Sequence, residues 1–290
     1  MKLNHDSPVE IQALLSERGL GLKKRWGQNF LVNRGAREKL VGLLHPGKDE
    51  TVWEIGPGLG SMTELLLPSA GRVVAFEIDR GLCLWLSERF QDEKRFILVE
   101  GDFLKTWRKA LEEHGEPSAV LGNLPYSCAS AIIAALIEGG VRPGRMILTV
   151  QKELADRMTA EPGTRNWSSF SLLCRWAFRM SSCGSLMPGS FYPVPEVVSA
   201  VVEAVPVERN DEVDTEILFP LIRSLFNARR KTLRNNLLSS PIAKKLGKSA
   251  VLDAVDRAHL EPGIRGEELP LEDVMRLAQE IARAKGSSAP

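Results

Sequence analysis

The chain has 290 residues, 43% of them hydrophobic and 26% charged, with a formal net charge of +1. This composition is ordinary for a globular protein with a sizeable core, and no apolar run approaches the roughly 18 residues that a membrane span needs. The four cysteines are scattered without C-x-x-C spacing, and we find no signal-peptide pattern. We therefore expect a cytoplasmic monomer with reduced thiols and without a metal.

The first predicted helix begins near the N-terminus. Ser7 is the expected N-cap, Pro8 occupies the first helical position, and Glu10 is placed to complete a capping box. Further along, strand-like runs begin near residues 51, 72, 95, 118 and 145, with helical patterns between them. Because βα units that recur at this length predict a parallel sheet, we expect an α/β fold with a Rossmann-like core.

The first of these strands leads into a glycine-rich loop, Glu54-Ile55-Gly56-Pro57-Gly58-Leu59-Gly60. Three glycines with one-residue gaps allow a sharp turn and a close approach of the backbone to a ligand. The spacing differs from the G-x-G-x-x-G dinucleotide fingerprint, and the Lys-Ser/Thr pair of a P-loop is missing. The loop therefore favours a nucleoside ligand without phosphates, and S-adenosylmethionine is such a ligand.

Acidic residues follow the next two strand-like runs. Glu77 ends the run that begins at residue 72, and Asp102 comes shortly after the run that begins near residue 95. A carboxylate after the second strand is where nucleotide-binding α/β folds bind ribose hydroxyls, so Glu77 is the ribose candidate and Asp102 a candidate acceptor for the adenine amine. Taken singly, each acid could be a solvated loop residue.

A second motif, Asn123-Leu124-Pro125-Tyr126, ends the apolar run of residues 119–122. An amide, a rigid proline and an aromatic ring offer hydrogen-bond acceptors and a stacking surface, which suits a planar amine such as an adenine base. A strand followed by a proline turn, with Tyr126 in the core, would explain the tetrapeptide alone. The glycine loop and both acids favour the first interpretation, because all of them would lie at one edge of a parallel sheet.

The composition changes after residue 207. A polar linker is followed by short helical patterns at about 215–227, 231–238, 249–255 and 271–284. We therefore expect two domains, a Rossmann-like domain over residues 1–207 with a basic N-terminal extension, and a small helical domain over residues 208–290.

Basic residues gather in two segments. Residues 217–249 contain eight Lys and Arg residues and no acid, and residues 18–37 contain six and no acid. A charge run is often only a solvated face, but two runs that flank a base pocket favour localised binding of RNA phosphates. The expected RNA-binding residues are Lys23, Lys24, Arg25, Arg229, Arg230, Lys231 and Arg234.

Six segments in order resemble one known family. They are residues 25–31, 54–60, 123–126, 151–153, 191–195 with Ser199-Ala200, and 226–236. They are similar to the KsgA (RsmA) family of small-subunit rRNA adenine dimethyltransferases. The resemblance implies a methyltransferase core that uses S-adenosylmethionine, with two added strands at residues 181–186 and 199–207.

For the reaction, the resemblance implies dimethylation of two adjacent adenosines in the 3'-terminal hairpin loop of 16S rRNA during biogenesis of the 30S subunit. The target base would lie between Tyr126 and Phe191, and the Asn123 oxygen and the Leu124 carbonyl are the candidate acceptors for its amine. The implied cofactor contacts are Asn29, Leu31, Gly56, Glu77, Asp102 and Asn123. The implied catalytic group is Asn123, Leu124, Pro125, Tyr126 and Phe191.

The chain departs from the family pattern at Ser127-Cys128 and at residues 167–171, and two alternatives stay open. One is the related large-subunit rRNA methyltransferase of the macrolide-resistance type, in which Asn-Ile-Pro is typical where this chain has Asn123-Leu124-Pro125. The other is a ribosome assembly factor that acts mainly by binding, which the basic segments would serve equally well.

Overall fold

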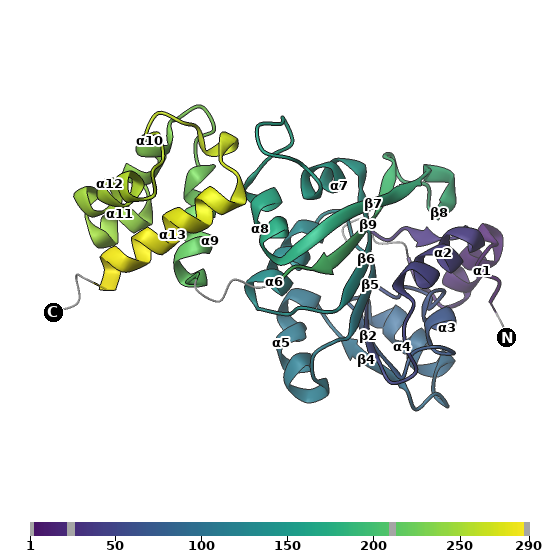
Figure 1. Ribbon diagram of the computed structural model, residues 1–290. Helices are drawn as coiled ribbons and strands as arrows, with labels where there is room; N and C mark the ends of the chain where they lie inside the picture. Colours follow the sequence, from purple (N-terminus) through teal and green to yellow (C-terminus); the bar gives the residue numbers. More distant parts are fainter. Residues whose placement is uncertain (1–2, 22–26, 209–212, 287–290) are drawn as a thin grey trace. The chain divides into compact units, whose positions relative to one another are not determined.

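The computed structural model describes residues 3–21, 27–208 and 213–286, and the chain divides into two compact units (Figure 1). Unit 1 consists of residues 1–155 and 180–206, and unit 2 of residues 156–179 and 207–290. The chain passes from one unit to the other three times, after residues 155, 179 and 206. The boundary expected after residue 207 lies within one residue of the last of these crossings, and the first two crossings were not expected. Residues 156–179 group with the C-terminal helices because Trp167 and Leu172 are buried in their core.

Unit 1 is organised around a sheet that has seven strands in the described part of the chain, in the order β4-β3-β2-β5-β6-β9-β7. Neighbouring strands from β4 to β6 pair in parallel, and β9 runs antiparallel to β6. The runs that predicted strands therefore form the parallel part, which confirms the Rossmann-like core. The strands are β2 (Thr51–Ile55), β3 (Arg72–Glu77), β4 (Phe96–Glu100), β5 (Ala119–Asn123), β6 (Arg145–Gln151), β7 (Phe178–Leu186) and β9 (Ser199–Pro206).

Helices cover both faces of this sheet, with α5 and α6 on one side and α2, α3 and α4 on the other (Figure 1). No helix in the described ranges is both long and apolar enough to cross a membrane. The helices up to the first crossing are α1 (Pro8–Glu17), α2 (Arg34–Leu44), α3 (Thr63–Leu66), α4 (Arg80–Arg89), α5 (Phe103–His114), α6 (Ala129–Glu138) and α7 (Lys152–Met158).

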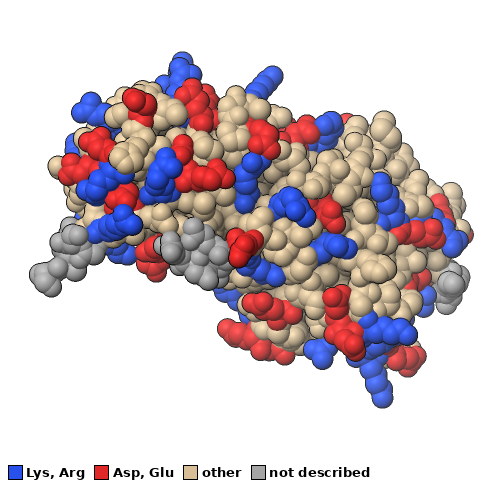
Figure 2. Space-filling view, in the orientation of Figure 1, with Lys and Arg blue, Asp and Glu red and all other residues tan. Residues whose placement is uncertain are grey.

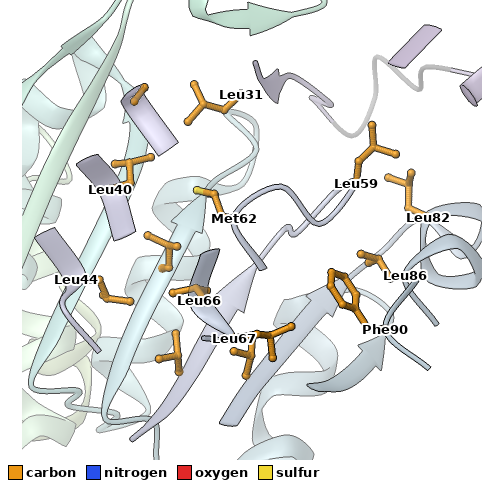
Figure 3. Close-up of a cluster of buried hydrophobic side chains, with 14 of the residues drawn as sticks. Leu31, Leu40, Leu44, Leu59, Met62, Leu66, Leu67, Leu82, Leu86 and Phe90 are labelled. Atoms are coloured by element: carbon orange, nitrogen blue, oxygen red, sulfur yellow. The ribbon is translucent and has the colours of Figure 1, made fainter. Parts of the chain in front are cut away.

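The main apolar cluster of unit 1 lies between the sheet and its helices. Figure 3 shows Leu40 and Leu44 of α2 with Leu66, Leu86 and Phe90, all of them buried. Because β2 and β3 are buried on both faces, their side chains are apolar almost without interruption, as parallel strands require.

The start of α1 differs in one detail from the expected capping box. The Ser7 hydroxyl accepts the Glu10 N–H at 3.3 Å, and Pro8 is the first helical residue, as predicted. The Glu10 carboxylate, however, accepts the Asn4 N–H at 3.2 Å and makes no reciprocal bond to Ser7. The glutamate therefore fixes the segment before the helix rather than the cap itself.

A small second sheet joins two distant segments. β1 (Phe30–Leu31) pairs antiparallel with β8 (Phe191–Tyr192), with Leu31 opposite Phe191. This pairing was not predicted from the sequence, because two-residue strands carry no periodic pattern. It brings the N-terminal segment to the loop between β7 and β9, which also contains the 3₁₀ helix Pro188–Ser190.

Unit 2 is helical among its described residues, and its core includes Trp167, Leu221 and Leu277. Its helices are α8 (Ser169–Ala177), α9 (Thr215–Leu225), α10 (Leu233–Leu238), α11 (Pro241–Leu246), α12 (Lys248–Arg257) and α13 (Leu271–Gly286), with a 3₁₀ turn at Gly266–Glu268. Four of these match the expected C-terminal helices. Helix α11 was not predicted, although its start carries a standard signal, the Ser240 N-cap followed by proline.

A glutamate lies fully buried in the centre of the parallel sheet. Glu54 of β2 has no exposed surface, and one of its oxygens accepts a hydrogen bond of 2.6 Å from the Thr63 hydroxyl at the start of α3. The other oxygen has no partner among the described residues. Burial raises the pKa of Glu54 to about 7, and the nearby Glu77 carboxylate adds to the shift.

We expect Glu54 to make stability depend on pH. Because its pKa is raised in the folded state, this group favours folding most at low pH, and the contribution is lost as the pH rises from the ordinary value of 4.5 to about 7. Urea unfolding between about pH 5 and pH 8 should show stability falling less steeply in Glu54→Gln than in the wild type. Glu116→Gln, which changes an exposed carboxyl, is the control. Equal pH dependence in wild type and Glu54→Gln would contradict the assignment.

Candidate functional site

A cavity lies in unit 1 at the carboxyl ends of four parallel strands. Its walls come from the loops after β2, β3, β4 and β5, at residues 56–58, 77–78, 101–103 and 123–126. Residues 27–31 complete the lining from the N-terminal side. The sheet edge at which α/β folds bind ligands is therefore hollow here, and the residues predicted from separate motifs meet around one space.

The glycine loop adopts the backbone conformation that its sequence predicts. Gly56, Gly58 and Gly60 have φ values of +74°, +58° and +84°, a region that other residues rarely adopt. At Gly58 a Cβ atom would come within 3.1 Å of the Phe30 ring, and at Gly60 within 2.8 Å of the Phe90 ring. The loop thus needs glycine for both its turn and its packing.

Glu77 ends β3 and is 5% exposed. Its Oε1 accepts the Asp79 N–H at 2.9 Å and its Oε2 accepts the Gly58 N–H at 3.1 Å. Burial raises the pKa of Glu77 to about 7, although the two N–H donors work in the opposite direction. The carboxylate therefore fixes the glycine loop, and each oxygen keeps a lone pair with which to accept a hydroxyl of a bound ribose.

Asp102 lies where the sequence placed it, after β4 and in the wall of the cavity. It is the N-cap of α5, and its Oδ1 accepts the Leu104 N–H at 3.0 Å. The capping bond holds the side chain in place at the start of the helix. Asn29, Leu31 and Gly56 also line the cavity, so all six predicted cofactor contacts face one space.

The Asn123 side chain has a fixed orientation. Its Nδ2 donates a 2.9 Å hydrogen bond to the Asn29 carbonyl, 94 residues away in sequence. Because a carbonyl can only accept, the amide nitrogen faces Asn29 and the amide oxygen is left as an acceptor. The Leu124 N–H donates to the Thr149 carbonyl at 3.1 Å, whereas the Leu124 carbonyl receives no hydrogen bond from the described residues. Two acceptors therefore stand at adjacent positions in the cavity wall.

The remaining residues of the tetrapeptide start the next helix. The Pro125 carbonyl accepts the N–H groups of Cys128 and Ala129 at 3.1 and 3.0 Å, which turns the chain into α6. The Tyr126 hydroxyl lies 2.5 Å from the Ser199 hydroxyl, and burial raises the pKa of Tyr126. This bond ties the half-buried Tyr126 ring, which lines the cavity, to the first residue of β9.

Phe191 lies elsewhere than the expected base pocket would suggest. Its side chain is 2% exposed, belongs to the main apolar cluster of unit 1, and is absent from the wall of the cavity. The ring is held there by the pairing of β8 with β1. Of the two aromatic residues expected to stack on the base, Tyr126 lines the cavity, and a stacking role for Phe191 would need its ring to be uncovered.

Two residues that support the cavity were missed by the sequence analysis. The Asp79 carboxylate accepts a 3.0 Å hydrogen bond from the Gln28 side chain, which joins the N-terminal segment to the loop after β3. The buried Arg37 of α2 donates to the Leu31 carbonyl at 2.8 Å and pairs with Asp6. Both hold the segment 27–31 against the cavity. The sequence signal for Arg37 is its position three residues before Leu40 and seven before Leu44, which places an arginine on the apolar face of α2.

The expected RNA-binding residues differ in their surroundings. Lys23, Lys24 and Arg25 lie outside the described residues. In unit 2, Arg229 is bound to the Glu267 carboxylate at 3.0 Å and to the carbonyls of Arg165 and Trp167 at 3.1 and 3.4 Å. Arg230, Lys231 and Arg234 are exposed and make no ion pair with another described residue. On the face that Figure 2 shows, basic and acidic side chains are interspersed.

The four cysteines are free, and the described residues contain no group of three or more histidine, cysteine or acidic side chains that could hold a metal ion. Cys128 lines the cavity, where burial raises the pKa of its thiol. The cavity therefore offers amide, carbonyl and carboxylate acceptors, glycine backbone and the aromatic rings of Phe30, Phe76, Phe103 and Tyr126, which are groups that bind a nucleoside and a planar amine.

Comparison with known proteins agrees with this chemistry. The sequence profile described as Ribosomal RNA adenine dimethylase matches residues 19–282. The chain is 39% identical over 282 residues to "Ribosomal RNA small subunit methyltransferase A" of Treponema denticola, covering 96% of each chain. It is 40% identical over 239 residues to the protein of the same name from Borrelia garinii subsp. bavariensis, covering 82% of this chain and 83% of the relative.

Solved structures share the fold. A dimethyladenosine transferase from Plasmodium falciparum aligns with a TM-score of 0.76 at 24% identity, covering 87% of this chain and 97% of its own. The 23S rRNA methyltransferase ErmE aligns with a TM-score of 0.61 at 24% identity, covering 88% and 100%. With a cavity built from the glycine loop, Glu77, Asp102 and Asn123, and with relatives matched over almost its full length, the chain belongs to the ribosomal RNA adenine dimethylase family, whose members are S-adenosylmethionine-dependent rRNA methyltransferases.

Proposed function

We propose that this protein dimethylates two adjacent adenosines in the 3'-terminal hairpin loop of 16S rRNA, within an immature 30S particle. The observation that carries the proposal is the orientation of Asn123, whose amide nitrogen is held by the Asn29 carbonyl. The free amide oxygen and the Leu124 carbonyl form a pair of acceptors, as the two hydrogens of an adenine amine require. The small-subunit relatives, which match at 39 to 40% identity, support the choice of subunit.

The cofactor would occupy the part of the cavity that the loops after β2, β3 and β4 line. Glu77 would accept the ribose hydroxyls, Asp102 the adenine amine of the cofactor, and the glycine loop would allow its close approach. Asn29 and Leu31 would contact it from the N-terminal segment, which Arg37 and Asp79 hold in place. Bound S-adenosylmethionine supplies an activated methyl group on a sulfonium.

The protein's part in the reaction is alignment of the target amine. The adenine N6 lone pair is delocalised into the ring, and acceptors that hold its two hydrogens favour the pyramidal geometry in which the lone pair can attack. Asn123 and Leu124 supply these acceptors, Pro125 fixes the turn between them and α6, and Tyr126 offers a ring on which a base can stack. Once the N–C bond has formed and the methyl–sulfur bond has broken, which would leave a neutral thioether, the nitrogen releases a proton to solvent. The remaining N–H permits a second round.

The direct test is transfer of labelled methyl groups from S-adenosylmethionine to small ribosomal subunits that lack the modification, followed by mass analysis of the digested RNA. Dimethyladenosine in small-subunit RNA is the expected product. Label in large-subunit RNA would overturn the choice of subunit, and label in neither would overturn the proposed activity. Binding of small subunits with no transfer would favour a role as an assembly factor.

Asn123→Ala should abolish most of this transfer. Loss of one oriented acceptor for the amine, together with the bond to Asn29, should lower kcat by at least about 100-fold. The variant's thermal unfolding and its small-subunit affinity serve as controls for folding and for substrate binding. Transfer within a fewfold of wild type, in a variant that is folded, would show that Asn123 does not align the amine.

Glu77 should make cofactor affinity depend on pH. Its ionised form is the better acceptor for two hydroxyls, and the pKa of about 7 means that this form grows with pH across neutrality. Isothermal titration should show S-adenosylmethionine binding more tightly at pH 8 than at pH 6, and Glu77→Gln should weaken binding about tenfold and remove most of this pH dependence. Retention of the wild-type profile by Glu77→Gln would exclude Glu77 as the ribose ligand.

Arg37 should support the cofactor wall without touching the cofactor. Arg37→Lys cannot make all three contacts to Leu31, His5 and Asp6, so the dissociation constant for S-adenosylmethionine should rise several-fold. Arg145→Lys is the matched control, because Arg145 also donates to a backbone carbonyl in unit 1, that of Leu43 at 3.0 Å, but does not hold the cavity wall. An equal change in cofactor affinity in both variants would mean that only overall stability is affected.

A further inference from the structure

The turn between α9 and α10 carries three consecutive basic residues, Arg229, Arg230 and Lys231. Within the turn the Lys231 N–H donates to the Ala228 carbonyl at 2.9 Å. A turn with so few regular hydrogen bonds would not by itself hold long cationic side chains in a constant arrangement. Contacts with the rest of unit 2 therefore add to its hydrogen bonds, among them the backbone bridge between Thr232 and Arg265.

Asn236 of α10 supplies one set of these contacts. Its side chain is 1% exposed, and its Nδ2 contacts three backbone carbonyls, those of Leu225 at 3.0 Å, Ala228 at 3.2 Å and Lys231 at 3.3 Å. These carbonyls lie before, within and at the end of the basic turn. The Asn236 oxygen has no hydrogen-bond partner among the described residues. Among the described residues the Asn236 amide therefore bonds only through its nitrogen, and the contacts of this nitrogen with the three carbonyls hold the turn in place.

Arg229 supplies the second anchor. Its guanidinium is bound to the Glu267 carboxylate and to the carbonyls of Arg165 and Trp167, all within unit 2. The first cation of the turn is thus used to hold the turn in place. The next two, Arg230 and Lys231, are exposed and pair with no acid in the described ranges.

We propose that Asn236 is a positioning residue for RNA phosphates: it fixes the turn so that Arg230 and Lys231 are presented together to the RNA backbone. This inference rests on the proposed function, methylation of rRNA, together with the sequence-based prediction that the basic residues of unit 2 bind RNA. Holding the turn in the free protein removes part of the ordering cost of binding. Each phosphate contact releases condensed counterions, so the two cations should contribute to the salt dependence of RNA binding as a pair.

The test measures affinity for an RNA hairpin with adjacent unpaired adenines in its loop, at several salt concentrations. Asn236→Ala should weaken binding about tenfold at low salt and reduce the slope of log K against log salt by about 1 to 2, as loss of up to two phosphate contacts requires. The dissociation constant for S-adenosylmethionine should not change. Asn235→Ala is the matched control, because it removes the same side chain from the adjacent exposed position of α10 and should behave as wild type.

A purely structural role for Asn236 is separated from positioning in two ways. Asn236→Ser keeps one donor and should show an intermediate loss of affinity with a more stable fold, so that the comparison does not depend on the alanine variant. In addition, Asn236→Ala combined with Arg230→Ala and Lys231→Ala should bind no more weakly than the latter pair alone. A further full loss in the triple variant would show that Asn236 acts independently of the two cations.

Failure of the inference and failure of the proposed RNA contact give different results. If the double substitution Arg230→Ala and Lys231→Ala leaves RNA affinity and salt slope unchanged, the turn does not contact RNA. Both RNA binding by this turn and the positioning role of Asn236 are then overturned. If the pair weakens binding but folded Asn236→Ala and Asn236→Ser keep the wild-type affinity and slope, unit 2 binds RNA and the positioning role of Asn236 is overturned.

Discussion

The hydrogen bond from the Asn123 amide nitrogen to the Asn29 carbonyl is the constraint on which the site depends. It joins the carboxyl end of a central strand to a segment that no element of the main sheet contains. By fixing the nitrogen, it determines which atom of the side chain remains to accept a hydrogen from a substrate. The same segment lines the cavity, so one bond sets both the orientation of the amide and the position of a wall.

Several contacts hold the segment of residues 27–31, which contains Asn29, in place. The pairing of β1 with β8, the Gln28 bond to Asp79 and the Arg37 bond to the Leu31 carbonyl approach it from different elements of unit 1. Asn236 does the same in unit 2 by binding the carbonyls of a basic turn. In both places a buried donor satisfies backbone carbonyls of irregular segments, which would otherwise lose hydrogen bonds on burial. As a result, the backbone that carries the proposed functional side chains is held in one conformation.

The burial of two glutamates, Glu54 and Glu77, lowers the stability of the fold next to the cavity. Glu54 and Glu77 lie on adjacent parallel strands, and burial raises the pKa of each to about 7. Burying such groups is unfavourable unless they are protonated or well bonded. Glu77 holds the glycine loop through the Gly58 N–H, and Glu54 binds Thr63 at the start of α3, the helix that follows the loop. The extensive apolar burial in the strands around them offsets this cost.

Much of the fold followed from the sequence, as did the grouping of Gly56, Glu77 and Asp102 around one cavity, because strands buried on both faces, glycines with positive φ and acids at strand ends leave local patterns. What could not be predicted depends on contacts between distant segments. The acceptor of the Asn123 amide is a backbone carbonyl, which has no sequence signature. The burial of Phe191 arises from a two-residue strand pairing, and the internal use of Arg229 from a partner 38 residues away.

In the proposed reaction Asn123 presents its oxygen to the target amine while its nitrogen stays bound to the Asn29 carbonyl. The most direct measurement is a crystal structure of the protein with adenosine and S-adenosylhomocysteine bound. We expect adenosine N6 within hydrogen-bond distance, about 3 Å, of both the Asn123 oxygen and the Leu124 carbonyl, with the bond to the Asn29 carbonyl retained. Adenine bound away from Asn123, or an amide turned so that its nitrogen faces the base, would contradict it.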